Sequence, residues 1–318
     1  MYGVKLYLVP ENLDKTIEKW HQLGFDTLFI GQSCKHDTDF LERLQKEKFF
    51  VNLIEPVFLA ENNINKKYLA IKKDGTQAVD SWVRFICPSN RKMMSAFYRR
   101  IKKDACLPVN SLSLDFIRFF QFWEMMNPQQ EHPDLVQTCY CKKCQKAQKK
   151  FPSVEEWRCS VVSSVVEKSE KIIKNKCSSK LIGLHLVPWT KDTFGNARQE
   201  ILGQNLKMLK SHVNFFTPML YHHMLHQKPA YVPQTLELLE KEVDGKVPFI
   251  PSIQAKEYYR QDTLTVEEIT ETSRLCLNRE DNKKNLVYFQ WTDIEENLKL
   301  YNSLVQLNCE LGEKNEKN

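Results

Sequence analysis

The residues best suited to chemistry lie together between Ser111 and Glu124, where the sequence reads SLSLDFIRFFQFWE. Apolar residues alternate with serines in its first part, which is typical of a short buried strand. Asp115 is the first acidic residue and comes where that strand should end. An unpaired buried carboxylate is costly, so we expect Asp115 either to form a structural pair with Arg118 or to lie at the rim of a site. The aromatic residues and the second carboxylate, Glu124, that follow within one loop favour a site.

The elements that would position these residues alternate along the chain, because eight apolar, strand-like runs each precede a helical pattern. The predicted strands are Tyr2 to Val9, Phe25 to Gly31, Phe49 to Glu55, Ser111 to Phe116, Leu181 to Trp189, Val213 to His222, Val247 to Gln254 and Leu286 to Trp291. The predicted helices are Leu13 to Leu23, Asp37 to Lys48, one capped by Ser89 and ending near Lys103, Val154 to Lys176, Ala197 to Ser211, Thr235 to Val243, Val266 to Leu277 and Asp293 to Leu307. Parallel strands need helical crossovers, and eight of them close without leaving an edge. The pattern therefore predicts an α/β fold of the (β/α)₈ TIM-barrel type.

We expect one barrel domain over residues 1–310, a long loop after the fourth strand from Phe119 to about Ser153, and a disordered tail at 311–318. The rival architecture is an open, doubly wound sheet, which usually has a glycine-rich phosphate loop after its first strand. The chain has nine glycines and neither a G-x-G-x-x-G nor a Walker motif. The barrel is therefore favoured.

Barrel enzymes carry their active sites at the carboxyl ends of the strands, so the side chains there form the candidate site. Asp115 is the candidate nucleophile or stabiliser of a developing cation, and the candidate proton donors are Glu257, Glu124 and Glu55, with Asp293 as a weaker fourth. The candidate substrate-binding residues are Arg118, Trp123, Trp189, Tyr221, His222, Gln254 and Trp291. Aromatic faces beside carboxylates suit sugar rings, and glycoside hydrolysis needs two carboxyl groups. We predict a glycosidase that cleaves an oligo- or polysaccharide; the alternative is a catalytically inactive, carbohydrate-binding barrel.

Three of the ten cysteines are grouped as Cys139, Cys141 and Cys144, in a C-x-C-x-x-C pattern. Three thiols at this spacing can converge on one tetrahedral ion, and zinc needs a fourth ligand. We expect Cys87 to be that ligand, because Cys106 precedes the fourth strand and should lie at the opposite end of the barrel; Cys34 is the other candidate. The expected zinc site is structural. A hydrolase or lyase that uses the metal directly is disfavoured, because no histidine accompanies the thiols.

The composition is that of a globular protein, with 42% hydrophobic and 27% charged residues in 318. The net charge of +6 is spread along the chain, and its lysine clusters are interpreted as solvated helix faces rather than a nucleic-acid site. No apolar run approaches the roughly 18 residues of a membrane span. The start of the chain is too short and polar for a signal peptide, so we expect a cytoplasmic protein. The expected partner is the carbohydrate substrate.

Three segments, in this order, carry a family resemblance: Trp82 to Ser89 with its Cys-Pro-Ser, the Leu-Asp-Phe-Ile-Arg of Leu114 to Arg118, and the cysteine cluster. They resemble the glycoside-hydrolase-like barrels whose fourth strand reads Asp-(aromatic)-Ile-Arg, and the cysteines are similar to the zinc loop of some barrel β-galactosidases. The resemblance implies a catalytic barrel acting on glycans, with Asp115 as the acid of the fourth strand. The chain departs from two of the patterns, so the resemblance does not identify the proton donor. Leu114-Asp115 stands where β-galactosidases have Asn-Glu, and Pro188-Trp189 stands where α-amylase-type barrels keep a glutamate.

Overall fold

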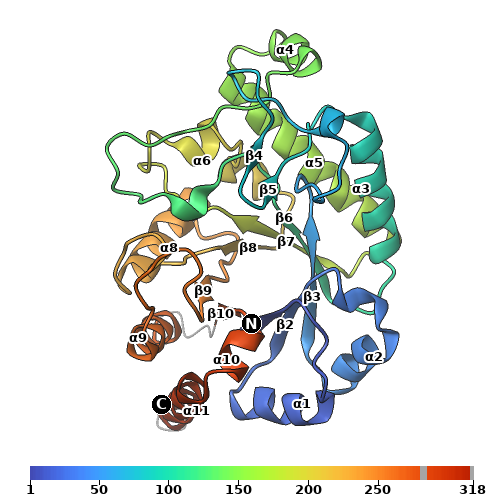
Figure 1. Cartoon of the computed structure of the whole chain (residues 1–318). Helices are drawn as coiled ribbons and strands as arrows, with labels where there is room; N and C mark the ends of the chain where they lie inside the picture. Colours follow the sequence, from blue (N-terminus) through green and yellow to red (C-terminus); the bar gives the residue numbers. More distant parts are fainter. Residues whose placement is uncertain (280–284, 316–318) are drawn as a thin grey trace.

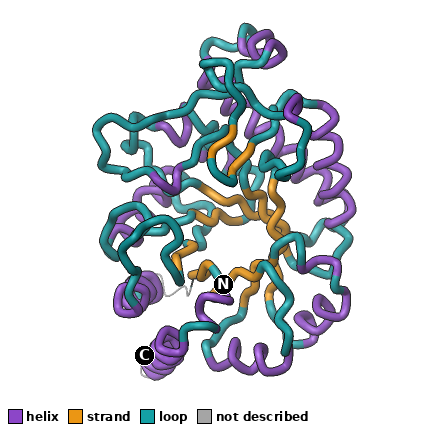
Figure 2. The backbone as a smooth tube through the Cα atoms, viewed as in Figure 1, coloured by secondary structure: helices purple, strands orange, loops and turns teal. Residues whose placement is uncertain are grey.

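The computed structural model describes residues 1–279 and 285–315, and within them eight parallel strands form the wall of a barrel. Their order is β8-β7-β6-β3-β2-β1-β10-β9, and parallel bridges from Phe216 to Phe249 and from Met219 to Ser252 join the two ends of the sheet. The strands surround the centre of the molecule and the helices lie outside them (Figures 1 and 2). The (β/α)₈ prediction is confirmed. The strands are β1 (Tyr2–Leu6), β2 (Thr27–Ile30), β3 (Phe50–Pro56), β6 (Ser111–Asp115), β7 (Leu181–Leu186), β8 (Phe215–Pro218), β9 (Ser252–Gln254) and β10 (Leu286–Phe289).

The outer layer follows the predicted alternation. The α-helices of the described residues are α1 (Leu13–Gln22), α2 (Thr38–Lys46), α3 (Arg91–Asp104), α4 (Lys142–Gln148), α5 (Val154–Lys176), α6 (Ala197–Glu200), α7 (Leu206–Leu209), α8 (Tyr231–Glu242), α9 (Val266–Leu277), α10 (Trp291–Glu295) and α11 (Leu298–Asn315). The short 3₁₀ helices are η1 (Cys34–His36), η2 (Lys66–Tyr68) and η3 (Trp123–Met125), and a small hairpin joins β4 (Val79–Asp80) to β5 (Val83–Arg84). None of the described helices is long and apolar enough to cross a membrane.

Local capping chemistry explains several helix starts. The side chain of Asn12 accepts a hydrogen bond from the N–H of Lys15 at the start of α1, and Thr265 forms the predicted capping box that opens α9. The cap of α3 differs from the prediction. It is Asn90 rather than Ser89, because the Asn90 side chain accepts from a backbone N–H of the first turn.

Two predicted helices are each divided in the structure. The segment 197–211 forms α6 and α7, separated at Gly203, whose φ of +75° turns the chain. The closing helix is divided into α10 and α11, and α11 continues to Asn315. Residues 311–315 of the predicted tail are therefore helical, and 316–318 lie outside the described residues.

The serines of β6 are explained by a polar chain inside the barrel. Ser111 Oγ donates to Asn52 Oδ1 at 2.6 Å, and Asn52 Nδ2 donates to Ser113 Oγ at 2.7 Å. Ser113 Oγ also lies 3.0 Å from His185 Nε2 of the neighbouring strand. Side chains on one face of a strand alternate with those of the other, so the leucines between the serines pack outward under the helices.

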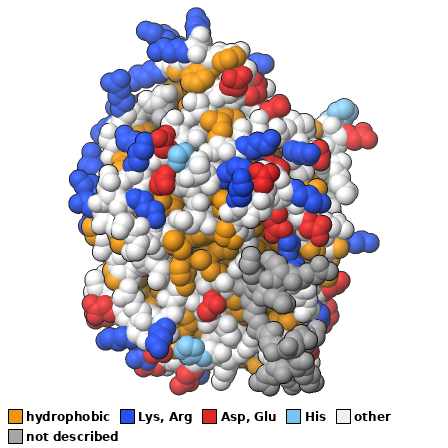
Figure 3. Space-filling model, turned by 180° about the vertical axis from the view of Figure 1, so that it is seen from behind, with side chains coloured by type: hydrophobic (Ala, Val, Ile, Leu, Met, Phe, Trp, Pro, Cys, Tyr) orange, Lys and Arg blue, Asp and Glu red, His pale blue; other side chains and the backbone are white. Residues whose placement is uncertain are grey.

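Basic residues gather on the outer surface near α4. Seen from behind, the top of the molecule, where α4 lies, carries a group of Lys and Arg side chains (Figures 1 and 3). The lysines of α4 and of the turn after it are all exposed: Lys142, Lys143, Lys146, Lys149 and Lys150. This agrees with the interpretation of the lysine clusters as solvated helix faces.

Candidate active site

A cleft of about 730 Å³ opens at the carboxyl ends of the barrel strands. Five of the residues predicted from the sequence line it: Asp115, Trp123, Glu124, Tyr221 and Gln254. They come from β6, from the long connection after it, and from the ends of β8 and β9. The barrel thus brings together residues that are more than a hundred positions apart in the chain, as its topology predicts.

Asp115 is the last residue of β6 and is partly exposed in the cleft. Its Oδ1 accepts the N–H of Phe116 at 2.7 Å. Phe116 has a φ of +50°, in a left-handed region that a phenylalanine rarely adopts. Strained backbone of this kind persists where the surrounding structure holds it, and it is common at functional sites.

Arg118 does not form the structural pair with Asp115 that the sequence left open. No ion pair joins the two side chains in the described part of the chain. The Arg118 guanidinium is buried, donates to the carbonyl of Gln121 at 2.7 Å and lies 4.9 Å from the centre of the Phe85 ring. Arg118 is also not among the lining residues of the cleft, so its predicted role as a direct sugar ligand does not agree with its position.

Glu124 lies in η3 and faces the same cleft with only 7% of its surface exposed. Burial raises the pKa of its carboxyl to about 7, although the nearby Arg118 lowers it. Its Oε2 has no hydrogen-bond partner within the described structure. A carboxyl that still holds its proton near neutral pH, beside a second carboxylate, can act as a general acid.

The other two candidate proton donors lie outside the cleft. Glu55 is fully buried, its Oε2 accepts from Arg100 Nε at 3.0 Å, and burial raises its pKa to about 7. Glu257 accepts from the backbone N–H groups of the three residues that follow it and from Gln254 Nε2. Burial opposes these bonds, yet they hold the pKa of Glu257 below its ordinary value, so it is an anionic structural group rather than a proton donor. The weaker candidate, Asp293, accepts the hydroxyl of Tyr258.

Three predicted sugar ligands are instead buried away from the cleft. Trp189 is fully buried with its ring edge against Phe194. Trp291 packs against Trp20, with 5.8 Å between ring centres. His222 is buried and neither ring nitrogen has a partner among the described residues. Each of these residues lies just past the end of a strand.

The aromatic rim comes largely from residues that were not predicted. Trp82, Tyr258, Tyr259 and Phe289 line the cleft. Trp82 follows the 60–81 excursion, and its Nε1 donates to the hydroxyl of Tyr259 at 3.1 Å across the cleft. A lone tryptophan in a polar connection was the available sequence signal, because such a residue usually needs a partner surface.

Lys5 is a further cleft residue that was not predicted. It lies on β1, lines the cleft and is 2% exposed. Tyr7, which directly follows β1, also lines the cleft. A charged residue within an apolar strand was the signal that could have identified it.

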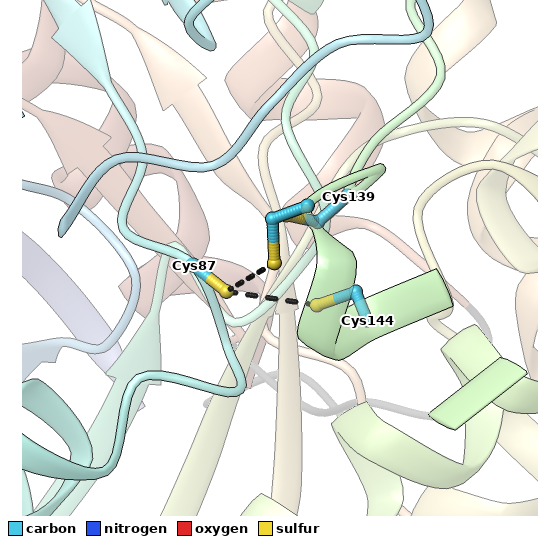
Figure 4. A group of neighbouring side chains, drawn as sticks. Cys87, Cys139 and Cys144 are labelled. Atoms are coloured by element: carbon cyan, nitrogen blue, oxygen red, sulfur yellow. Dashed lines mark hydrogen bonds between the residues drawn. The ribbon is translucent and has the colours of Figure 1, made fainter. Parts of the chain in front are cut away.

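Four of the cysteines form a compact cluster. The sulfur atoms of Cys87, Cys139, Cys141 and Cys144 all lie within 4.8 Å of one another, and Cys87 lies 3.6 Å from both Cys141 and Cys144. Figure 4 shows three of them, Cys87, Cys139 and Cys144, pointing toward one another. With Zn–S bonds of about 2.3 Å, a tetrahedral site has sulfurs about 3.8 Å apart, so these four residues could hold such an ion.

The cluster confirms the grouping of the four cysteines and the choice of Cys87 as the fourth. The N–H of Ile71 lies 3.4 Å from Cys139 Sγ, in position to donate to it. Donors of this kind support anionic thiolate ligands. Cys34 lies elsewhere, with its sulfur near the carbonyl of Leu6.

The chain matches no family model and no curated protein. Among solved structures it is similar to the glycoside hydrolase domain of PgaB (BpsB) from Bordetella bronchiseptica, with a TM-score of 0.68 and 10% identity over 96% of this chain and 97% of that chain. It is also similar to the β-galactosidase from Bacillus circulans sp. alkalophilus, with a TM-score of 0.70, 11% identity and 98% of this chain covered. It is similar as well to Gan42B, a β-galactosidase from G. stearothermophilus, with a TM-score of 0.69 and 10% identity.

These similarities show that the chain has the barrel fold that is found in glycoside hydrolase domains. The chain spans 55% and 56% of the two β-galactosidase chains, but nearly the whole of the PgaB domain. At about 10% identity the similarity extends to the fold alone. Fold similarity does not transfer an activity, so function has to be argued from the cleft.

Proposed function

We propose that this protein is a glycoside-hydrolase-like enzyme that cleaves a glycosidic bond of an oligo- or polysaccharide. The observation that carries the proposal is the pairing of Asp115 with Glu124 in one aromatic-lined cleft, where burial raises the pKa of Glu124 to about 7. Glycoside hydrolysis needs one carboxyl that gives a proton and one that stays anionic. The similar structures support the class, since they include glycoside hydrolase domains of PgaB and PelA.

In this mechanism Glu124 protonates the oxygen of the leaving sugar. Asp115, at the end of β6, acts on the anomeric centre as nucleophile, as base for a water molecule, or as stabiliser of the oxocarbenium-like transition state. The faces of Trp82 and Tyr258, which are 43% and 41% exposed, bind the sugar rings at the rim. Trp123 and Tyr221 line the deeper part of the cleft, 6.0 Å apart between ring centres.

The cysteine cluster is proposed as a structural zinc site. Zinc bound by four thiolates has no open position for substrate or water, so it would supply cross-linking rather than catalysis. Cys87 follows the 60–85 segment that carries Trp82, whereas Cys139, Cys141 and Cys144 belong to the connection that carries Glu124. Joining the two segments would fix the rim and the acid relative to each other.

The test is a screen of 4-nitrophenyl glycosides and neutral polysaccharides for product release, followed by two variants. Asp115→Asn and Glu124→Gln should each lower kcat by about 10²–10⁴-fold on the active substrate, while oligosaccharide binding changes little. Glu131→Gln is the matched control, because Glu131 is an exposed acid of the same connection. It should retain activity.

The competing carbohydrate-binding barrel gives a different result. A wild-type protein that binds oligosaccharides with the affinity of its Asp115→Asn variant and releases no product from any of them would support it. Full activity of both acid variants would overturn the assignment of Asp115 and Glu124.

A further inference from the structure

The floor of the cleft carries a buried cation. Lys5 of β1 is 2% exposed and lines the cleft. Its Nζ donates to the hydroxyl of Tyr221 at 3.4 Å and lies 5.5 Å from the centre of the Phe289 ring. Among the described lining residues, Lys5 is the one with a cationic side chain.

Lys5 has fewer acceptors than a buried ammonium needs. The group has three N–H donors, yet its one hydrogen bond to a described residue is the long one to Tyr221, and no ion pair within 4.0 Å is formed there. Lys35 shows the contrast. It is 9% exposed, and its Nζ lies 2.6 Å from both Asp104 Oδ2 and Gln32 Oε1. Burying an ammonium without such partners is costly, so Lys5 is not explained by stability.

The groups around Lys5 leave it charged at neutral pH. Burial lowers its pKa to about 8, and Asp115 from β6 partly opposes this. Burial also keeps its other titratable neighbours neutral: the pKa of His185 of β7 is lowered to about 4, and the pKa values of Tyr7 and Tyr221 are raised. A donor-only cation therefore lies near an acceptor-only carboxylate, without direct contact.

We propose that Lys5 contacts the substrate and determines specificity: its ammonium donates to a hydroxyl oxygen of the sugar unit that lies against Asp115. This rests on the proposed function. A hydroxyl both donates and accepts, so one placed between the two side chains accepts from Lys5 and donates to Asp115. A sugar carboxylate would satisfy Lys5 but repel Asp115. The cleft floor is thus suited to a neutral, hydroxyl-bearing sugar.

The first test needs no substrate. Lys5→Met removes the ammonium and keeps an unbranched, apolar side chain, so its melting temperature at neutral pH should equal or exceed that of the wild type. Lys35→Met is the matched control: it leaves Asp104 buried without its cation and should lower the melting temperature by about 5 °C or more. A Lys5→Met variant destabilised as much as Lys35→Met would show that Lys5 is structural and would overturn the proposal.

The second test follows the ammonium directly by NMR, with ¹⁵N-labelled lysine and lactose, cellotetraose and chitotetraose as probes. A bound sugar should shift the Lys5 Nζ resonance and raise the pKa of Lys5, because an added acceptor favours the charged form; Lys35 should not respond. A sugar that shifts the indole resonances of Trp82 and Trp123 but leaves Lys5 unchanged would contradict the proposal.

Kinetics separate this inference from the proposed function. On a substrate that the wild type hydrolyses, Lys5→Met should lower kcat/KM at least about tenfold. A Lys5 resonance that responds to a sugar that is never hydrolysed would support the role of Lys5 and argue against hydrolysis. Unchanged kcat/KM in the Lys5→Met variant would overturn the role of Lys5 and leave the proposed hydrolysis intact.

Discussion

The two carboxyl groups of the cleft lie in different environments. Glu124 is 7% exposed and burial raises its pKa to about 7, whereas Asp115 is partly exposed at a strand end and its carboxylate accepts a backbone N–H. Two acids in unlike environments can serve as acid and base in one reaction. The two groups therefore differ in solvation more than in residue type.

This difference predicts a pH dependence. Glu124 loses its proton as the pH rises through about 7, so kcat/KM should fall above that pH if Glu124 is the general acid. The measurement is kcat/KM between about pH 5 and 9. Glu131→Gln should keep the alkaline limb in place. An activity that stays constant to pH 9 would exclude Glu124 from that role.

The sequence predicted some residues of the candidate site and missed others, and the reason lies in where each residue stands relative to its strand. Asp115 and Glu124 were predicted because they follow an alternating strand within one loop. Glu55 also ends a strand, but it lies next to Ile54, which faces the barrel interior, so Glu55 must face α3. His222 and Trp189 lie beyond their strands, where the fold of the connections decides the direction of a side chain and periodicity no longer does.

Among the elements, the long connection after β6 determines how the site is assembled. It carries Glu124 and three of the clustered cysteines, and the fourth comes from the segment after β5. The spacing C-x-C-x-x-C predicted the cluster, and the barrel topology predicted Cys87, because both depend on order along the chain. The contact of Trp82 with Tyr259 could not be predicted, since it joins the turn of the β4–β5 hairpin to the irregular segment after β9.

Metal analysis tests the cross-link. Purified protein should contain about one zinc ion per chain, and Cys141→Ser should lower that content and the activity while the far-UV circular dichroism of the barrel persists. Cys106→Ser is the control, because Cys106 is exposed and lies outside the cluster. Sub-stoichiometric zinc that is the same in wild type and Cys141→Ser would contradict a zinc site.

The break between α6 and α7 gives a stability prediction. A methyl group on Gly203 would lie 2.7 Å from the carbonyl oxygen of Arg158, and the residue has a φ of +75°. Gly203→Ala should destabilise the protein by about 2–4 kcal/mol, measured by urea unfolding. Gly245→Ala is the control: its φ is +63° but its surroundings are open, so it should cost about 1 kcal/mol. Equal losses would mean that the steric contact at Gly203 is relieved.

For the whole molecule, the alternation of strands and helices predicted the architecture although individual boundaries differed by several residues. Closing eight strands depends on their number and order, which the sequence displays, and much less on where each one ends. The ring then brings Lys5 of β1, Asp115 of β6 and Tyr221 beyond β8 to one floor. Neither the depth of that floor nor the burial of Lys5 can be obtained from a pattern, because both depend on packing across the barrel.

The most direct measurement is a crystal structure of the Glu124→Gln variant with an oligosaccharide that the wild type cleaves. We predict that the glycosidic oxygen lies within about 3 Å of the side chain at position 124, with the anomeric carbon of the same bond beside Asp115 and a hydroxyl of that sugar in contact with Lys5. A sugar bound outside this cleft, or bound in it with the scissile bond remote from both carboxyl positions, would contradict the assignment of Asp115 and Glu124 as the catalytic pair.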